Sequence, residues 1–404
     1  MNYFSINPIY TILDIGTTKI FAIIAEKTPN EIKILGIGEA PSYGLEKGIV
    51  KDISITAQCI KEAIDEAQLR AQVFVESVSV GISGNHIKSY FSQGMTTIGQ
   101  SGITEKIIYE ATLAAQSISL PDDEKIIHTV PINYIIDGIH HIKNPLNMHG
   151  FRLEVTTHIM TANKHAVANI AEACKQAQLK ITELVLEPIA SAEAVLNDEE
   201  KEIGTLLVDI GGGTSDIALY KNGNLEYVHI LNIAGITFTK DLSICLNIGR
   251  EQAEIIKKKY GIINDKEEEE IFATALDGTT ELCFSKTLPQ QILSARAEEL
   301  IFYLANILEN NKDNYYIPGG IVLTGGGALL KGLPEMVSRY TGIHCRVGIP
   351  HINQEQKYDI IKHPSFATAY GLLLYRISQD KRFNKQEPNN TFIQKFKNFV
   401  NKFI

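Results

Sequence analysis

The chain has 404 residues, 44% of them hydrophobic and 21% charged, so we expect a globular protein of two or more domains or one large composite domain. Its net charge of −9 argues against a general nucleic-acid binder, because neutralising phosphates takes clustered Lys and Arg. Five scattered cysteines without a C-x-x-C pair predict buried thiols of a reducing compartment. Without a signal-peptide pattern or a long apolar run, we expect a cytoplasmic chain that spans no membrane.

Two segments, residues 9–24 and 203–220, follow one plan: IYTILDIGTTKIFAII and IGTLLVDIGGGTSDIALY. Each has an apolar β-branched run, the triplet Asp-Ile-Gly, small or hydroxyl residues, and a second apolar run. This pattern predicts two β-hairpins whose tips are rich in Gly and Thr. The triplets begin at Asp14 and Asp209, so each copy could head one half of the molecule.

Such tips are suited to phosphate, because Gly lets successive backbone N–H groups converge on an anion. An Asp at the strand end offers oxygen ligands to Mg²⁺, through its waters. A single copy is more often an ordinary hairpin turn, but a third cluster favours a nucleotide site. There we predict a strand over residues 321–324, the triplet Gly325-Gly326-Gly327, and a helix from about Ala328. No P-loop pattern is present.

The last fourteen residues, 391–404, predict an amphipathic helix. On a helix the seven large apolar side chains fall within an arc of roughly 140° and three lysines lie outside it, with no acid. The helix would be about 21 Å long, too short to span a bilayer, and its binding to anionic lipid would be weak and reversible. Docking onto its own domain or a protein partner is the alternative. The predicted membrane-binding residues are Phe392, Ile393, Lys395, Phe396, Lys397, Phe399, Val400, Lys402, Phe403 and Ile404.

The motifs LDIGTTK, VDIGGGTSD and IVLTGGG resemble the actin/sugar-kinase/heat-shock-chaperone ATPase superfamily. Longer stretches, among them SVSVGISGNHIKSYFSQG and HPSFATAYGLLLYR, resemble the FtsA family of bacterial cell-division proteins. The resemblance implies an α/β, actin-like ATPase fold, in which two halves, each on a mixed five-stranded sheet with helices, close around ATP and Mg²⁺. It further implies a protein that polymerises, tethers the FtsZ ring to the inner membrane at the division site through the C-terminal helix, and recruits later division proteins.

The same resemblance implies a domain order. Subdomain 1A would comprise residues 1–82, 162–198 and 352–378, interrupted by the family insertion 1C at 83–161. Subdomain 2A would comprise residues 199–232 and 300–351, with 2B at 233–299 between them. Residues 379–390 would form a flexible linker before the terminal helix.

Site residues carry over by motif. The first phosphate loop would use Asp14, Gly16, Thr17, Thr18 and Lys19, and the second Asp209, Gly211, Gly212, Gly213 and Thr214, with Asp14 and Asp209 at the metal. Gly235 would lie near the phosphates, Glu254 and Lys257 would line ribose and adenine, and Gly325, Gly326 and Gly327 would form the adenosine loop. Lys19 could instead be a solvated hairpin lysine, and Glu254 with Lys257 a surface ion pair. Asp216 could equally contact the ligand or be a turn residue that bonds to its own backbone.

Glu187, before a proline, matches the glutamate that positions the attacking water, although an acid also suits the first turn of a helix. We expect ATP binding with at most slow hydrolysis. Arg296 matches the arginine that receives the FtsZ C-terminal peptide, but it could simply pair with Glu299. Two other members of the superfamily are the alternatives. A small-molecule kinase would need an acceptor site that we cannot identify in this chain, and a PilM-like pilus assembly module would have no amphipathic tail. The chain is too short for a 70-kDa chaperone.

Overall fold

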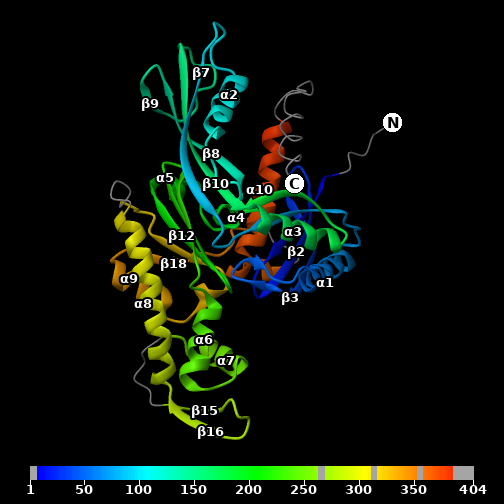
Figure 1. Ribbon diagram of the computed structural model, residues 1–404, viewed down its shortest axis with the longest axis vertical. Coiled ribbons are helices and arrows are strands. Elements are labelled where there is room, and N and C mark those ends of the chain that lie inside the picture. Colours follow the sequence, from blue (N-terminus) through cyan, green and yellow to red (C-terminus); the bar gives the residue numbers. More distant parts are fainter. Residues whose placement is uncertain (1–6, 263–268, 311–315, 353–357, 385–404) are drawn as a thin grey trace.

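The computed structural model describes residues 7–262, 269–310, 316–352 and 358–384. Three units follow one another along its longest axis: a small sheet at one end, a central body with two larger sheets, and a helical region with a hairpin at the other (Figure 1). The amphipathic helix predicted at 391–404 lies outside the described residues. No described helix combines the length and the apolar character that crossing a membrane requires.

The first large sheet has the order β11-β6-β1-β2-β3. Its strands are β1 (Ile9–Ile15), β2 (Lys19–Lys27), β3 (Ile32–Pro41), β6 (Ser77–Ile82) and β11 (Lys180–Leu186). β1 pairs antiparallel with β2 and parallel with β6, so the sheet is mixed, as predicted. Helices α1 (Ile53–Ala71) and α3 (Lys164–Gln176) cover one face, where Leu13 and Ala22 are buried.

The second large sheet repeats this plan in the order β14-β13-β12-β17-β18. Its strands are β12 (Thr205–Ile210), β13 (Ser215–Lys221), β14 (Asn224–Leu231), β17 (Ile321–Thr324) and β18 (Cys345–Val347). Four helices share its outer core: α6 (Gly235–Leu246), α7 (Arg250–Tyr260), α8 (Thr287–Asn310) and α9 (Leu333–Thr341). Both predicted hairpins, β1–β2 and β12–β13, are therefore confirmed.

Two helices pack between the large sheets. They are α4 (Glu187–Val195) and α10 (Ala367–Asn384), seen at the centre of the molecule in Figure 1. One hydrophobic core joins their side chains to Ile12 and Phe21 of the first sheet and to Leu207 and Ala218 of the second. This shared core joins the two halves of the molecule.

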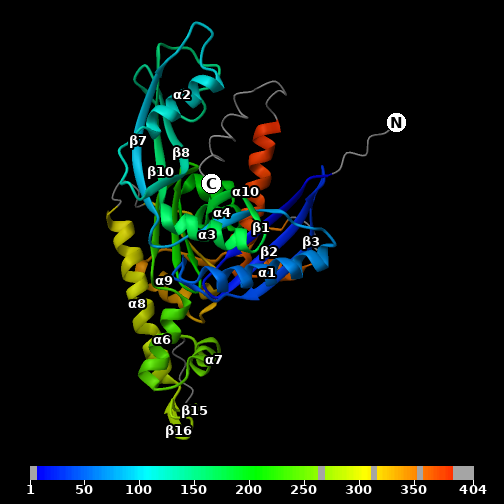
Figure 2. The same ribbon diagram turned by 45° about the vertical axis from the view of Figure 1, so that its right-hand side comes forward.

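The small sheet is an insertion between β6 and β11. Its order is β7-β10-β8-β9, with β7 (Lys88–Thr97), β8 (Glu124–Ile136), β9 (Ile139–Ile142) and β10 (Arg152–Asn163), and α2 (Glu105–Gln116) packs on it. It projects from the central body, and the hairpin of β15 (Glu270–Thr274) and β16 (Glu281–Ser285) lies at the opposite end (Figure 2). The shorter elements are β4 (Leu45–Glu46), β5 (Ile49–Val50) and α5 (Asp198–Ile203).

The structure corrects three expectations. A 3₁₀ turn, Gly326–Leu329, begins within the third glycine cluster. Helix α9 begins only at Leu333, because Gly332 takes a left-handed φ of 86° and a proline follows in the first turn. Cys245 and Cys283 are exposed rather than buried, since they lie on the outside of α6 and on the two-stranded hairpin. α10 continues to Asn384, so no linker begins at 379; an ion pair between Arg376 and Asp380 supports this last stretch.

Candidate functional site

The tips of the two hairpins meet directly. A Cβ atom on Gly212 would overlap the side chain of Thr18, and one on Gly213 would overlap that of Thr17. Only glycine therefore allows the loops to approach this closely. Gly211 closes its own tip, because its N–H donates to the carbonyl of Thr214 at 2.9 Å. The structure thus brings together the two loops that the sequence predicted as a pair.

Four carboxylates gather beside these tips. Asp14 lies near the end of β1, Asp209 near the end of β12, Asp216 on β13, and Glu187 opens α4. Burial and the charge of Asp209 raise the pKa of Asp14 to about 7. Burial, followed by the charges of Asp14, Asp216 and Asp209, raises the pKa of Glu187 well above its usual value. The cluster is therefore electrostatically strained when no cation is present.

Hydroxyl groups from outside the second sheet hold two of these acids. Ser83, just after β6, donates to Asp216 at 2.6 Å, and burial still raises the pKa of Asp216 to about 8. Ser191 on α4 and Thr368 on α10 donate to Asp209 at 2.5 and 2.9 Å. Burial nevertheless raises the pKa of Asp209. No salt bridge reaches any of the four carboxylates within the described part of the chain.

The four acids do not form a complete set of metal ligands. Among the described residues, no group of three or more His, Cys, Asp or Glu side chains is arranged to hold a metal by itself. Mg²⁺ needs fewer protein ligands, because it keeps several waters and binds one or two carboxylates together with phosphate oxygens. Buried carboxylates with raised pKa values fit an ion that binds in this way.

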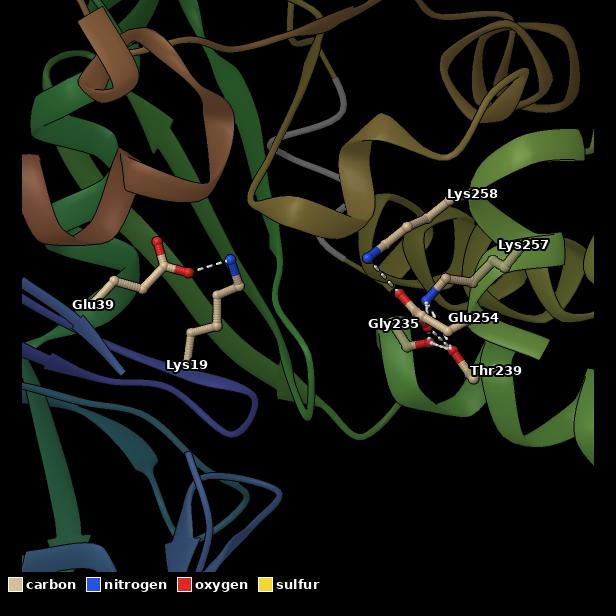
Figure 3. Close-up of polar contacts among 7 residues, drawn as sticks. All are labelled: Lys19, Glu39, Gly235, Thr239, Glu254, Lys257 and Lys258. Atoms are coloured by element: carbon tan, nitrogen blue, oxygen red, sulfur yellow. Dashed lines mark hydrogen bonds and ion pairs between the residues drawn. The ribbon is translucent and has the colours of Figure 1, made fainter. Parts of the chain in front are cut away.

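The other predicted nucleotide contacts fall into two groups. Gly235, Glu254 and Lys257 come together where α6 meets α7, around the hydroxyl of Thr239 (Figure 3). Lys19 is separate from them and forms an ion pair with Glu39 on β3, so its ammonium group does not lie free at the loop. This pair resembles the solvated hairpin lysine that was the alternative interpretation.

The third glycine cluster packs against the second hairpin. Gly325 has a φ of 80°, and a Cβ there would overlap the carboxylate of Asp209. A Cβ on Gly327 would overlap Ile210, whereas none of the residues that the structure describes lies within 4 Å of one on Gly326. Gly16 is restricted by its own hairpin, since a Cβ would come within 2.8 Å of the carbonyl of Lys19.

Arg296 is engaged within the protein. Its guanidinium donates to both carboxylate oxygens of Asp241, at 2.6 and 3.1 Å, and also pairs with Glu299. These hydrogen bonds, Asp241 first, raise the pKa of Arg296 above its ordinary value. The expected pair with Glu299 exists, and Asp241 on α6 is a partner that the sequence did not reveal.

Sequence reasoning missed the hydroxyl residues of the site. Ser191, Thr368 and Thr239 bond to predicted site residues, and Ser83 bonds to Asp216, whose role the sequence left open. Only Thr239 carried a local signal, because it lies one helical turn after Gly235. The others come from segments that are distant in the sequence.

The fold and the paired loops define the class: two halves on mixed five-stranded sheets, joined through helices, with the two hairpin tips in contact, as in actin-like proteins. The PilM–PilN type IV pilus biogenesis complex contains a similar chain, with a TM-score of 0.67, 21% identity, and coverage of 91% of this chain and 98% of that one. MreB5 of Spiroplasma citri bound to AMPPNP gives a TM-score of 0.57 at 15% identity, covering 93% and 98%. These likenesses establish the actin-like fold.

Sequence comparison gives the family. Residues 206–371 match the model of cell division protein FtsA, and residues 84–161 match the SHS2 domain inserted in FtsA. The FtsA of Pseudomonas aeruginosa is 33% identical over 96% of both chains, and that of Neisseria meningitidis serogroup B is 36% identical over 90% of this chain and 89% of its own. The chain belongs to the FtsA family of cell division proteins.

Proposed function

We propose that the chain binds ATP with Mg²⁺ between its two halves, at the hairpin tips. This proposal is carried by the contact of the two hairpin tips beside four carboxylates that have no cationic partner among the described residues. Asp14 and Asp209 would hold the ion through its waters, and the N–H groups of both tips would face the phosphates. Bound Mg²⁺ supplies the positive charge that offsets the phosphate oxygens. MreB5 of Spiroplasma citri, bound to AMPPNP, shares the fold.

Glu187 is proposed to orient a water molecule toward the γ-phosphate. Its position as the first residue of α4, beside Gly81, holds the carboxylate at the edge of the acidic cluster. The raised pKa of Glu187 favours the protonated acid, which cannot accept a proton. A cation in the cluster would favour the carboxylate, so the ability to hydrolyse would depend on the ion.

The wider role we propose is that of an actin-like filament at the cytoplasmic face of the inner membrane. The chain would polymerise, tether the FtsZ ring by binding its C-terminal peptide, with Arg296 at that surface, and recruit later division proteins. Release of Asp241 or Glu299 would free Arg296 for the peptide. Subdomains 1A, 1C, 2A and 2B would divide as the family resemblance implies.

Membrane attachment would use the terminal segment, whose apolar and lysine side chains predict an amphipathic helix. A single weak anchor gains from polymerisation, because linking many anchors raises their effective concentration. We expect sedimentation with anionic vesicles to rise with ATP and Mg²⁺ and to be lost when residues 391–404 are deleted.

Two controls make the vesicle experiment specific. Neutral vesicles should bind less of the full-length chain, since three lysines add about 1 kcal/mol each beside anionic lipid. The truncated chain should bind ATP as the full-length chain does. Equal sedimentation of both chains with anionic vesicles would refute membrane attachment by the tail, without affecting the nucleotide site.

A further inference from the structure

The ammonium group of Lys257 is fully used inside the protein. Its Nζ atom lies 2.6 Å from Oε2 of Glu254, 2.9 Å from Oγ1 of Thr239 and 3.0 Å from the carbonyl oxygen of Gly235 (Figure 3). A lysine has three N–H donors and no acceptor. The side chain is only 13% exposed. Lys257 can therefore donate to a ligand only by giving up one of these partners.

Thr239 connects the charged groups of this cluster. Its hydroxyl accepts from Lys257 and has one proton to donate, for which Oε2 of Glu254 at 2.5 Å and the carbonyl of Gly235 at 3.0 Å compete. The carboxylate contact is shorter and charge-assisted, so the proton goes to Glu254. Thr239 is buried on α6, whereas Glu254 and Lys257 lie on α7. One hydroxyl thus fixes both side chains across the helix pair.

Glu254 keeps one oxygen for a ligand. Its Oε2 atom already accepts from Thr239 and Lys257, whereas Oε1 meets Lys258 at 3.3 Å, and the Lys258 side chain is 73% exposed. A carboxylate oxygen accepts two hydrogen bonds or more. The Glu254 side chain is 35% exposed, and Oε1 retains capacity to accept a further hydrogen bond.

The cluster is also fixed to the second hairpin tip. The N–H groups of Gly235 and Ile236 donate to the carbonyls of Gly211 and Gly212, at 2.9 and 2.8 Å. Because the carbonyl of Gly235 accepts from Lys257, a continuous series of bonds runs from the hairpin tip to the carboxylate of Glu254. A nucleotide whose phosphates rest on the tip would have the position of its sugar set relative to Oε1.

We propose that Thr239 is a positioning residue for ribose recognition. It holds Lys257 as an internal support and keeps Oε1 of Glu254 directed at a ribose hydroxyl. This inference rests on the proposed nucleotide site and revises the expectation that Lys257 itself contacts the nucleotide. The ligand class is a ribonucleotide, distinguished from nucleotides without 2′- and 3′-hydroxyl groups.

The test compares the Kd of ATP with that of 2′,3′-dideoxy-ATP, both with Mg²⁺ and the full-length chain. The wild type should prefer ATP about 10- to 100-fold, the usual effect of one hydrogen bond to a charged group. Thr239→Val should reduce this preference to less than about 3-fold, because Oε1 is no longer held, and Thr239→Ser should preserve it. Thr237→Val is the matched control, since among the described residues that hydroxyl bonds only to Ala234 at the start of α6.

Each other outcome overturns a defined part of the inference. If Thr239→Val weakens ATP and dideoxy-ATP equally, or keeps the preference, Thr239 does not position the ribose contact. If the wild type binds both nucleotides alike, Glu254 does not read a ribose hydroxyl, although the nucleotide site stands. If the wild type binds neither, the proposed site falls and this inference with it. Should Thr239→Val not fold, Thr239→Ala gives the same comparison without a methyl group facing Lys257.

Discussion

The carboxylates at the hairpin tips and the carboxylate between α6 and α7 have pKa values shifted in opposite directions. At the tips, Asp209 and Asp216 accept hydrogen bonds from hydroxyl groups. Burial and neighbouring carboxylate charges still raise the pKa values of Asp14 and Asp216. Between α6 and α7, burial favours a raised pKa for Glu254 as well, but hydrogen bonds from Lys257 and Thr239 lower it. Both regions belong to the same candidate site.

The difference indicates separate tasks. Uncompensated buried carboxylates disfavour the ligand-free state and gain from a cation, so their strain can be relieved by binding. A carboxylate already neutralised and hydrogen-bonded gains little from a further cation, but it offers a fixed acceptor and costs little to order on binding. We infer that the tips respond to the metal and phosphates, whereas the α6–α7 cluster is a preorganised surface.

The largest effect should come from Glu187. Glu187→Gln keeps the size of the side chain but removes its ability to accept a proton, so single-turnover ATP hydrolysis should fall on the order of 100-fold while ATP binding persists. Phosphate release with protein in excess measures this rate. If the wild type and Glu187→Gln hydrolyse ATP at the same rate, or if neither hydrolyses it, the proposed role of Glu187 is contradicted.

A smaller effect is expected at Asp209. Asp209→Ala removes a carboxylate that would hold the ion through water, so the Kd of Mg-ATP should rise about 10- to 100-fold, the range found when outer-sphere partners of a metal are lost. Asp359→Ala is the control, since that side chain is 85% exposed and pairs only with Lys362 among the described residues. Unchanged affinity in Asp209→Ala would place the ion elsewhere.

The sequence was sufficient for the tips because their information is local. An apolar run, Asp-Ile-Gly and a second apolar run fixed both hairpins, and the four residues predicted for the third strand are those of β17. Repetition of the pattern, rather than either copy, identified the two loops as a pair. The close approach of Thr18 and Thr17 requires glycine at positions 212 and 213, and the sequence could only suggest this requirement.

The hydroxyl partners could not be predicted in the same way. Ser83 and Asp216 are 133 residues apart, and Thr368 and Asp209 are 159 apart, so only the packing of β6, α4 and α10 against the second sheet joins them. The spacing of Glu254 and Lys257 did place them on one face of a helix, but it did not show that Thr239 would use up the donors of Lys257.

The smallest predicted effect is a change of stability with pH that only the acidic cluster produces. The pKa of Asp216 rises from 3.8 to about 8 on folding, so between these values the folded chain keeps a proton that the unfolded chain has released. Stability then falls as the pH rises, by about 1.4 kcal/mol per pH unit for each such proton. The lowered pKa of Glu254 contributes stability that is lost only in acid, so this carboxylate should not respond near pH 7.

The window from pH 7 to 8 isolates this effect. Burial lowers the pKa of His128 to about 4 and that of His158 below its usual value, and such groups affect stability only below about pH 6.5. Without nucleotide, the midpoint of thermal unfolding should be lower at pH 8 than at pH 7. Asp216→Asn should flatten this slope, whereas Asp359→Asn should leave it unchanged, and Mg-ATP should reduce it by favouring the charged carboxylates. A midpoint that rises from pH 7 to 8 would show that the acids at the tips are already compensated, and the contrast between the two clusters would disappear.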